Sequence, residues 1–394
     1  MAMTADVTRR RFMGSAAAAL AAIGLKPDSK VWAQPGRAPT FPMSRDDEYD
    51  SLIKLASNEN PWGPSEAMME AMNSAWKYSN RYGYPDGNVR EVIAEHHGVR
   101  PENILLHAGS AETLRVAGLT FLGHDEKVVG VEPTFTTVYQ AASGIDADVV
   151  ALPLNDDATQ NIDEMIRVTR RNYRDVGMVY LCNPNNPTGI TVSSHDVQKL
   201  LDGIPEDIPV LIDEAYHHFI MDPSYATAVP YVKEGRKVLV TRTFSKIYGM
   251  AGMRLGYGIA PRDMISDMRR YTTGTVNALA KWGGVAALAD TETEHWVRDE
   301  TIRVREETRE ALIEMGFKVL PSDTNFFMVH TGRMASEVRG EFRRRNIAVG
   351  RDFPPMLDYL RVSISTEEDM DKFMEAWQEI FPDGMTADAG TRGN

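Results

Sequence analysis

One lysine lies in a segment whose neighbouring residues suggest a reaction with an aldehyde. Thr243, Ser245 and Lys246 follow the apolar run at 238–240, and Arg254 lies eight residues beyond the lysine. A lysine amine forms a Schiff base with an aldehyde once burial or nearby cations lower its pKa. Arginine binds phosphate in a bidentate manner, and hydroxyl groups add donors. The segment therefore indicates a site for a phosphorylated aldehyde, although most lysines are simply solvated.

Two earlier segments also carry polar groups after apolar runs. Asp213 ends the run at 210–212, Tyr216 lies three residues later, and the segment 183–189 (Asn-Pro-Asn-Asn-Pro-Thr-Gly) follows the run at 178–181. Open α/β sheets bind ligands at the carboxyl ends of their strands. An acid there could hold the proton of a ring nitrogen, and a phenol could donate to a ring oxygen. Taken alone, the two segments are more simply a helix cap with a packed tyrosine and a Pro/Gly turn.

Short apolar runs alternate with helical stretches through the first two-thirds of the chain. A helix is predicted over 89–97. The predicted strands are 104–106, 128–131, 149–152, 178–181, 210–212 and 238–240. This alternation indicates an α/β fold with a mostly parallel sheet, and the nearly continuous apolar runs indicate burial on both faces. The ends of these strands would position the polar residues described above.

The pattern changes after about residue 280. A long charged helix is predicted over 292–315, with its charges on a solvated face and not in a binding site. Strands at 326–329 and 360–364 and a helix at 367–380 follow. These elements indicate a smaller α+β domain, and the Gly-, Asp- and Thr-rich residues 383–394 indicate a loose tail.

Charge and cysteine content argue against several classes of protein. The 394 residues suffice for two or three domains, and they carry a formal net charge of −13 and one cysteine, Cys182. Nucleic-acid binding is not expected, because it requires Lys and Arg to meet phosphates, although a local basic pocket remains compatible with this charge. One cysteine permits no intrachain disulfide, and no run reaches the 18 apolar residues of a membrane span.

The first 33 residues have the layout of an export signal. Arg9, Arg10 and Arg11 precede Phe12, an Ala-rich stretch follows, and Val-Trp-Ala at 31–33 supplies small residues for cleavage. The segment looks like a twin-arginine signal peptide; the alternative is a basic N-terminal arm. Such signals imply export after folding, often with a cofactor bound, to the periplasm or outside the cell. Cleavage would leave a formal charge of −16.

Three motifs together resemble one enzyme family. Asn-Pro-Thr-Gly at 186–189, Asp-Glu-Ala-Tyr at 213–216, and Ser-Lys at 245–246 followed by Arg254 occur in the order found in fold-type I, class I/II pyridoxal-phosphate aminotransferases. Within that family the resemblance is to the histidinol-phosphate aminotransferases, over roughly residues 50–380. It implies an α/β large domain with a mostly parallel sheet at 78–279 and a smaller α+β domain at 280–382. Residues 34–77 would form an N-terminal arm and part of the small domain.

The resemblance also implies roles around the cofactor, pyridoxal 5′-phosphate. Lys246 would form the Schiff base and act catalytically together with Asp213, the partner of the pyridine nitrogen, and Tyr216. Asn186 and Tyr216 would bind the ring's 3-oxygen, and Phe135 would stack on the ring; taken alone, Phe135 is a core aromatic residue. The phosphate ligands would be the backbone of Ser110 and Ala111 at a helix start, Ser245, Arg254 and Thr243.

A tyrosine from a second subunit would complete the cofactor site. The segment 81–86 (Arg-Tyr-Gly-Tyr-Pro-Asp) resembles the family's Arg-Tyr-Pro-Asp, with two residues inserted. Either Tyr82 or Tyr84 could reach the partner's cofactor phosphate, and we favour Tyr82 because it directly follows Arg81. The implied assembly is a homodimer with shared active sites.

The substrate residues follow from the same resemblance. Arg361 would bind the substrate carboxylate, Arg351 would lie near a substrate phosphate, and Asn60 belongs to a loop that would close over the substrate. The adjacent His217 and His218 lack a matching acid cluster, so no metal site is expected.

The implied reaction moves an amino group from an amino acid, or from an amine like histidinol phosphate, to a 2-oxo acid. Two alternatives use the same residues. One is a decarboxylase, lyase or cyclase of the same fold, and the other is an exported binding protein without catalysis. Histidine synthesis belongs in the cytoplasm, which conflicts with an export signal and leaves a general amino-acid aminotransferase as an option.

Overall fold

The computed structural model describes residues 46–385 of the chain. The predicted leader at 1–33 and the part of the predicted tail beyond residue 385 lie outside the described residues. The chain divides into two units, 1–51 and 52–394. In the first unit the described structure is the short helix α2 (Asp46–Ser51). The elements described below belong to the second unit. The domain boundaries predicted at 77/78 and 279/280 within it stay predictions.

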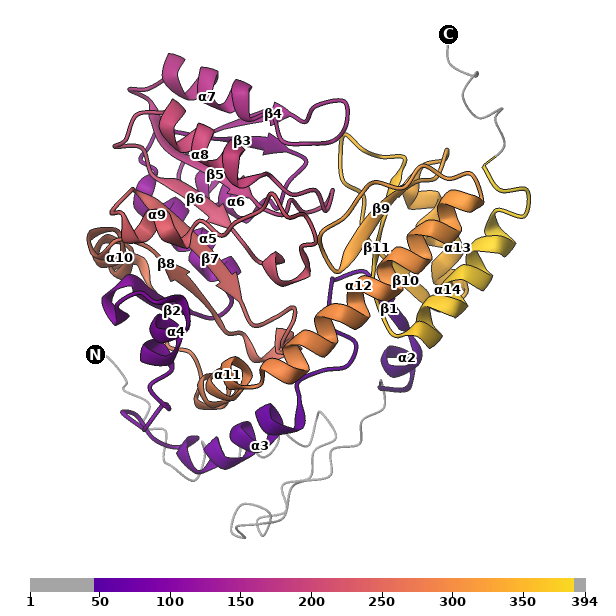
Figure 1. Cartoon of the computed structure of the whole chain (residues 1–394), viewed down its shortest axis with the longest axis horizontal. Helices are drawn as coiled ribbons and strands as arrows, with labels where there is room; N and C mark the ends of the chain where they lie inside the picture. Colours follow the sequence, from indigo (N-terminus) through magenta and orange to yellow (C-terminus); the bar gives the residue numbers. More distant parts are fainter. Residues whose placement is uncertain (1–45, 386–394) are drawn as a thin grey trace, which may run out of the picture. The chain divides into compact units, whose positions relative to one another are not determined.

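A seven-stranded sheet forms the centre of the larger part (Figure 1). In spatial order its strands are β2 (Ile104–His107), β8 (Gly256–Ile259), β7 (Val238–Thr243), β6 (Val210–Asp213), β5 (Val176–Cys182), β3 (Lys127–Glu132) and β4 (Asp148–Pro153). The pairs β3–β4, β3–β5, β5–β6 and β6–β7 are parallel, whereas β8 pairs antiparallel with both neighbours. The mostly parallel α/β fold expected from the sequence is confirmed.

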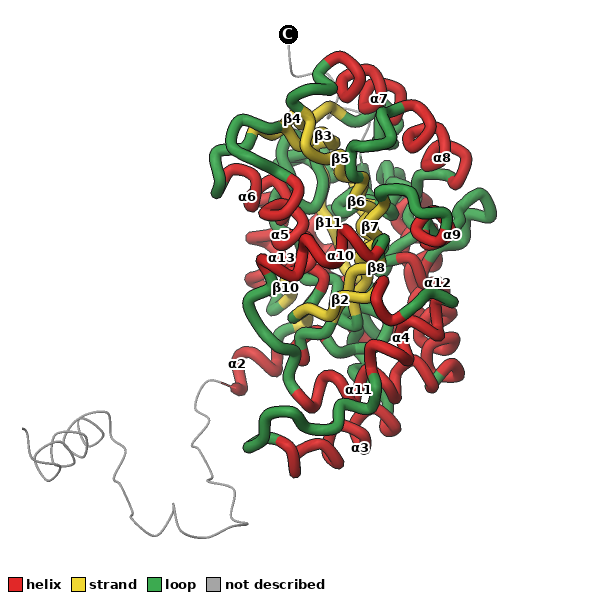
Figure 2. The backbone as a smooth tube through the Cα atoms, turned by 90° about the vertical axis from the view of Figure 1, so that its left-hand side faces the viewer, coloured by secondary structure: helices red, strands yellow, loops and turns green. Residues whose placement is uncertain are grey.

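Alternate residues of the strands enter two separate cores. Leu239 of β7 packs in one core, and its neighbours Val238 and Val240 pack in the other. Figure 2 shows α5 and α6 on one side of the sheet and α7, α8 and α9 on the other. Burial on both faces explains why the strands read as continuous apolar runs.

Helices and short 3-10 turns surround this sheet. The helices are α3 (Glu66–Ala75), α4 (Val89–His97), α5 (Ser110–Phe121), α6 (Thr137–Ser143), α7 (Ile162–Arg171), α8 (Ser194–Gly203), α9 (Val229–Lys233), α10 (Arg262–Met268) and α11 (Ala278–Ala289). The 3-10 turns are Trp76–Tyr78, Pro101–Asn103, His217–Phe219, Ala251–Met253 and Arg269–Tyr271.

The C-terminal part contains two small sheets. β9 (Phe326–His330) pairs antiparallel with β11 (Tyr359–Ser363), and β10 (Ile347–Val349) pairs parallel with β1 (Ile53–Leu55). The helices α12 (Thr291–Glu314), α13 (Ala335–Arg344) and α14 (Glu367–Ile380) accompany them. Their common core contains Phe327, Phe342, Phe373 and Trp377, all fully buried. β1 thus joins a segment near residue 54 to the C-terminal elements.

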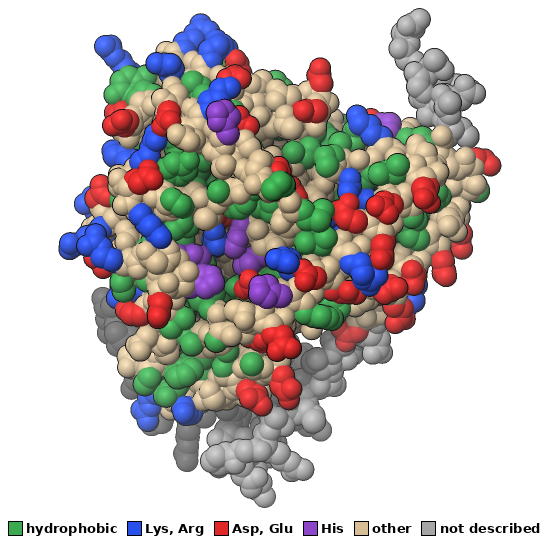
Figure 3. Space-filling model, in the orientation of Figure 1, with side chains coloured by type: hydrophobic (Ala, Val, Ile, Leu, Met, Phe, Trp, Pro, Cys, Tyr) green, Lys and Arg blue, Asp and Glu red, His purple; other side chains and the backbone are tan. Residues whose placement is uncertain are grey.

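The long charged helix is confirmed, but its charges are not all solvated. Arg305 of α12 is completely buried, and its Nη1 donates to the carbonyl of Thr324 at 2.8 Å. Acidic side chains do gather over the C-terminal helices on the face shown in Figure 3. Among residues 46–385 no helix combines the length and apolar character that crossing a membrane requires.

Candidate active site

A cavity of about 730 Å³ opens where three parallel strands end. Cys182, Asp213 and Thr243, the last residues of β5, β6 and β7, line it. Val349 of β10 and Arg361 of β11 line it from the C-terminal part. The cavity therefore lies at the sheet edge where α/β folds bind ligands, between that edge and the C-terminal sheets.

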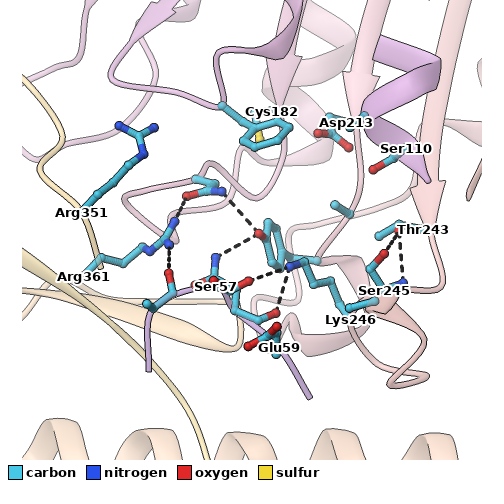
Figure 4. A pocket seen from close by; sticks show the side chains of 18 of the residues that line it. Ser57, Glu59, Ser110, Cys182, Asp213, Thr243, Ser245, Lys246, Arg351 and Arg361 are labelled. Atoms are coloured by element: carbon cyan, nitrogen blue, oxygen red, sulfur yellow. Dashed lines mark hydrogen bonds between the residues drawn. The ribbon is translucent and has the colours of Figure 1, made fainter. Parts of the chain in front are cut away.

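Lys246 lies in the middle of this cavity (Figure 4). Its Nζ donates to the backbone carbonyls of Asn58 at 2.9 Å and Ser57 at 3.1 Å. Burial, with a further contribution from the positive charges of Arg361 and Arg254, lowers the pKa of Lys246 to about 8. An amine with this pKa can exchange a proton near neutral pH, as a Schiff-base lysine and general base must.

Asp213 provides a buried acid at the carboxyl end of β6. The side chain is 2% exposed, and Thr241 donates its hydroxyl hydrogen to Oδ1 at 2.8 Å. Burial raises the pKa of Asp213 to about 6 against the opposing hydrogen bond from Thr241. A protonated ring nitrogen beside this carboxyl group would stabilise its ionised form.

The hydroxyl of Tyr216 is held by two amide groups. It accepts hydrogen bonds from Nδ2 of Asn58 at 3.0 Å and from Nδ2 of Asn186 at 3.3 Å. Burial raises the pKa of Tyr216, so the phenol stays protonated. Because the oxygen already accepts two bonds, its own hydrogen is available for donation to an oxygen atom in the cavity.

A cradle for a phosphate lies at the opposite end of the cavity from Arg361 and Arg351 (Figure 4). Gly109 precedes α5 with φ of +87°, and a Cβ atom there would lie 2.3 Å from the Arg254 guanidinium. Thr243 Oγ1 donates to Ser245 Oγ at 2.9 Å, and Arg254 Nη1 lies 3.4 Å from the same oxygen. The lining residues at this end are Ser110, Ala111, Thr243, Ser245 and Arg254. A helix start, hydroxyl groups and an arginine suit a phosphate dianion.

These groups fit pyridoxal 5′-phosphate. The partly buried amine of Lys246 suits its aldehyde, the buried Asp213 its ring nitrogen, and the hydroxyl of Tyr216 its 3-oxygen. Phe135 also lines the cavity and is partly buried, as a ring-stacking residue would be. The glycine at 109 leaves open the space beside Arg254 that a side chain would fill.

Arg361 is a buried cation of the cavity lining. It is 7% exposed, and its Nη1 and Nη2 donate to Asn186 Oδ1 at 2.7 Å and to the Ala56 carbonyl at 2.6 Å. Its Nε has no partner, and within the described part of the chain no carboxylate pairs with it. Burial lowers the pKa of Arg361 to about 10, and the charge of Arg351, which also lines the cavity, adds to this. Arg361 and Arg351 together present two positive charges that suit the binding of an anion.

Two residues predicted for the site do not line the cavity. The amide of Asn60 donates to the Ile247 carbonyl at 2.8 Å, and its Oδ1 accepts from the Trp62 backbone, so it holds a turn. Tyr82 is fully exposed, whereas the hydroxyl of Tyr84 donates to the Val276 carbonyl at 3.1 Å within the same chain. A substrate role for Asn60 and a cofactor role for Tyr82 stay predictions.

Several lining residues were not anticipated. Asn58 and Glu59 lie beside Asn60 in a segment that the resemblance had already marked, and these two residues line the cavity. Arg339 and Phe353 also line the cavity. No local signal separates Arg339 from the other arginines of its charged helix.

The adjacent His217 and His218 make structural contacts within the fold. His217 shares a hydrogen bond of 2.8 Å with Arg242 Nη1, and Arg242 forms an ion pair of 2.6 Å with buried Glu214. The ring centres of His217 and His218 lie 3.6 Å apart, with the ring planes tilted by 38°. Within residues 46–385 no group of three or more His, Cys, Asp or Glu side chains could hold a metal ion.

The fold and this site define a fold-type I pyridoxal-phosphate transferase. Residues 50–376 match the family model "Aminotransferase class I and II". The chain therefore belongs to the class I and II aminotransferases, and it is a pyridoxal-phosphate-dependent aminotransferase.

Proteins of similar sequence and structure support this family assignment. The chain is 32% identical to the histidinol-phosphate aminotransferase of Halalkalibacterium halodurans, over 90% of this chain and 95% of that protein. It is 33% identical to the Brevibacillus brevis protein of the same name, over 88% of this chain and 95% of that protein. The fold matches the structure of histidinol-phosphate aminotransferase from Sinorhizobium meliloti in complex with pyridoxal-5′-phosphate, with a TM-score of 0.77 and 23% identity. The match covers 89% of this chain and 96% of that chain. The family match and the two relatives favour amino transfer over the decarboxylase, lyase, cyclase and binding-protein alternatives.

The geometry suits several of the chain's own groups to parts of this reaction. Bound pyridoxal 5′-phosphate supplies an aldehyde for the amine and a ring that delocalises the electrons left at the α-carbon. With the cofactor bound, the amine of Lys246 would take up and return the α-proton, and the carbonyls of Ser57 and Asn58 are placed to accept hydrogen bonds from it. Asp213 would keep a proton on the ring nitrogen, and the O–H of Tyr216 would donate to the ring oxygen.

Replacing Lys246 with Ala should abolish turnover and the covalent retention of cofactor after borohydride reduction, because the amine both binds the aldehyde and moves the proton. Steady-state rates and the mass of the reduced protein measure the two effects. Lys372→Ala, which removes an exposed lysine paired with Glu368 on α14, is the control. Undiminished transamination by the Lys246 variant would contradict the assignment.

Proposed function

We propose that the amino donor carries an anionic group and that a 2-oxo acid is the acceptor. Buried Arg361 carries this proposal, because it has a free Nε and no carboxylate partner among the described residues. A buried cation in this state is stabilised by an incoming anion. Arg351 lines the same end of the cavity.

The name shared by the similar proteins points to one donor in particular. An amine like histidinol phosphate would place its phosphate at Arg361 and Arg351, whereas an amino acid would place its carboxylate there. Two arginines favour the phosphate, because it carries nearly two negative charges at neutral pH. An amino acid remains the second candidate, since Arg361 alone suits a carboxylate.

A screen of amino donors against 2-oxoglutarate tests this proposal. Arg361→Gln should raise KM for the best anionic donor by roughly ten- to hundredfold, because hydrogen bonds to a charged group are lost. The cofactor should remain covalently bound, because Lys246 is retained. Arg298→Gln, on the exposed surface of α12 beside Asp299, is the matched control. Preference for uncharged donors in the native enzyme would refute the proposal.

We propose further that the enzyme is a homodimer in which Tyr82 reaches the cofactor phosphate of the second subunit. Tyr82 is fully exposed in the single chain, whereas Tyr84 stacks on Tyr78 at 6.0 Å and bonds Val276. The solvent-exposed side chain of Tyr82 is free to extend into the active site of a neighbouring subunit.

Mixed dimers test the shared site. Tyr82→Phe should weaken cofactor binding and lower activity, and mixing it with inactive Lys246→Ala should restore activity, because one site of the mixed dimer then has both native residues. Sedimentation gives the assembly state. Loss of activity in Tyr84→Phe but not in Tyr82→Phe would reverse the choice of tyrosine.

We propose, finally, that residues 1–33 are a twin-arginine leader, so that the enzyme folds in the cytoplasm and the twin-arginine export machinery carries it to the periplasm or out of the cell. The arginines at 9–11, Phe12 and the small residues at 31–33 support this. The buried Cys182 is compatible, because no disulfide has to form outside.

Replacing Arg9 and Arg10 together with Lys should retain the protein in the cytoplasm, since the signal is read as an arginine pair. Cell fractionation measures the distribution, with Arg170→Lys, at the end of α7, as the control. Unchanged export of the double variant would exclude this route.

A further inference from the structure

Three arginines from three elements meet at the donor end of the cavity. Arg361 comes from β11, Arg351 follows β10, and Arg339 comes from α13. The guanidinium carbons of Arg351 and Arg361 lie 4.4 and 4.7 Å from the ring centre of Phe353. Figure 4 shows Arg351 and Arg361 on the same side of the site. The aromatic ring thus sets the spacing of two of the three cations.

Asp352 contacts the other two arginines through different atoms. Its carboxylate accepts from Arg339 Nη1 at 2.9 Å and from Nη2 at 3.5 Å, and its backbone carbonyl accepts from Arg351 Nη1 at 3.0 Å. The side chains of Arg339 and Asp352 are 36% and 33% exposed. The ion pair is therefore accessible to solvent and within reach of competing ions.

The charges at this end do not cancel. Three guanidinium groups face one carboxylate, since Arg361 has no acidic partner in the described part of the chain. The charge of Arg351 helps to lower the pKa of Arg361, so these two cations interact. An anionic donor is attracted by the arginines and repelled by Asp352, and both effects grow with the charge of the donor.

We propose that Arg339 and Asp352 are specificity-determining residues that set how strongly the enzyme discriminates by the charge of the donor. Arg339 is a third cation of the donor site, and Asp352 is a built-in counter-anion that weakens it. The inference rests on the proposed function, because it concerns the same anionic end of the donor. It predicts opposite effects for the two members of one ion pair.

Two single variants and their combination test the inference in the full-length holoenzyme. Asp352→Asn should lower KM for a phosphorylated amine by roughly two- to fivefold, and Arg339→Gln should raise it by a similar factor, in the range of solvent-exposed charge pairs. The double variant should return close to the native KM, because the net charge is restored. The same amine without its phosphate should show no change, and kcat should change less than KM. Histidinol phosphate and histidinol are a suitable pair of probes.

Glu379→Gln is the matched control for charge, because Glu379 pairs with Arg345 at 2.9 Å outside the cavity lining. Melting temperature and cofactor spectrum confirm that each variant folds. Equal KM values for all variants, or equal changes for both probes, would overturn the inference. Native enzyme that rejects every anionic donor would instead refute the proposed function, so the two failures are distinguishable.

Discussion

The amine of Lys246 is held by a segment 188 and 189 residues earlier in the chain, and this contact fixes the geometry of the site. The carbonyls of Ser57 and Asn58 accept its hydrogens, and the side chain of Asn58 donates to Tyr216. Asn58 Oδ1 in turn accepts from Ser363 Oγ at 2.8 Å. One short segment therefore connects Lys246, Tyr216 and β11. Asn58 adopts φ of +54°, a conformation that asparagine tolerates better than most residues.

An ion pair between Glu214 and Arg242 stabilises the ends of β6 and β7 on the face of the sheet opposite to Asp213. Glu214 and Arg242 are the chain neighbours of Asp213 and Thr241, so their side chains point to the other face of the sheet. Their ion pair is nearly completely buried, and the hydroxyl of Thr227 donates to Glu214 at 2.9 Å. A buried pair of this kind is costly to break. The pair ties the end of β6 to β7 and so supports the position of Asp213, the acid predicted to face the ring nitrogen.

The sequence predicted most of what depends on strands buried on both faces. Asp213, Lys246 and Arg254 were found because they follow continuous apolar runs or belong to ordered motifs. β8 was missed because Gly256 and Gly258 provide no apolar pattern. A Cβ atom on Gly256 would lie 2.3 Å from the backbone nitrogen of Ser110, so the glycine is required by close packing that only the structure reveals. The short β1 and β10 are likewise specified by pairing between distant segments. Arg339 could not be found, since its role depends on the spatial position of Asp352.

The single cysteine has a practical consequence. Cys182 is 1% exposed at the end of β5, and burial raises the pKa of its thiol, so neither access nor ionisation favours reaction. A cysteine introduced on the surface would then be the one thiol that labelling reagents reach. A pair of such residues, one on α8 and one on α14, would carry a donor and an acceptor dye without removal of the native thiol. Energy transfer between the dyes would measure whether the distance between the C-terminal part and the central sheet changes when substrate binds.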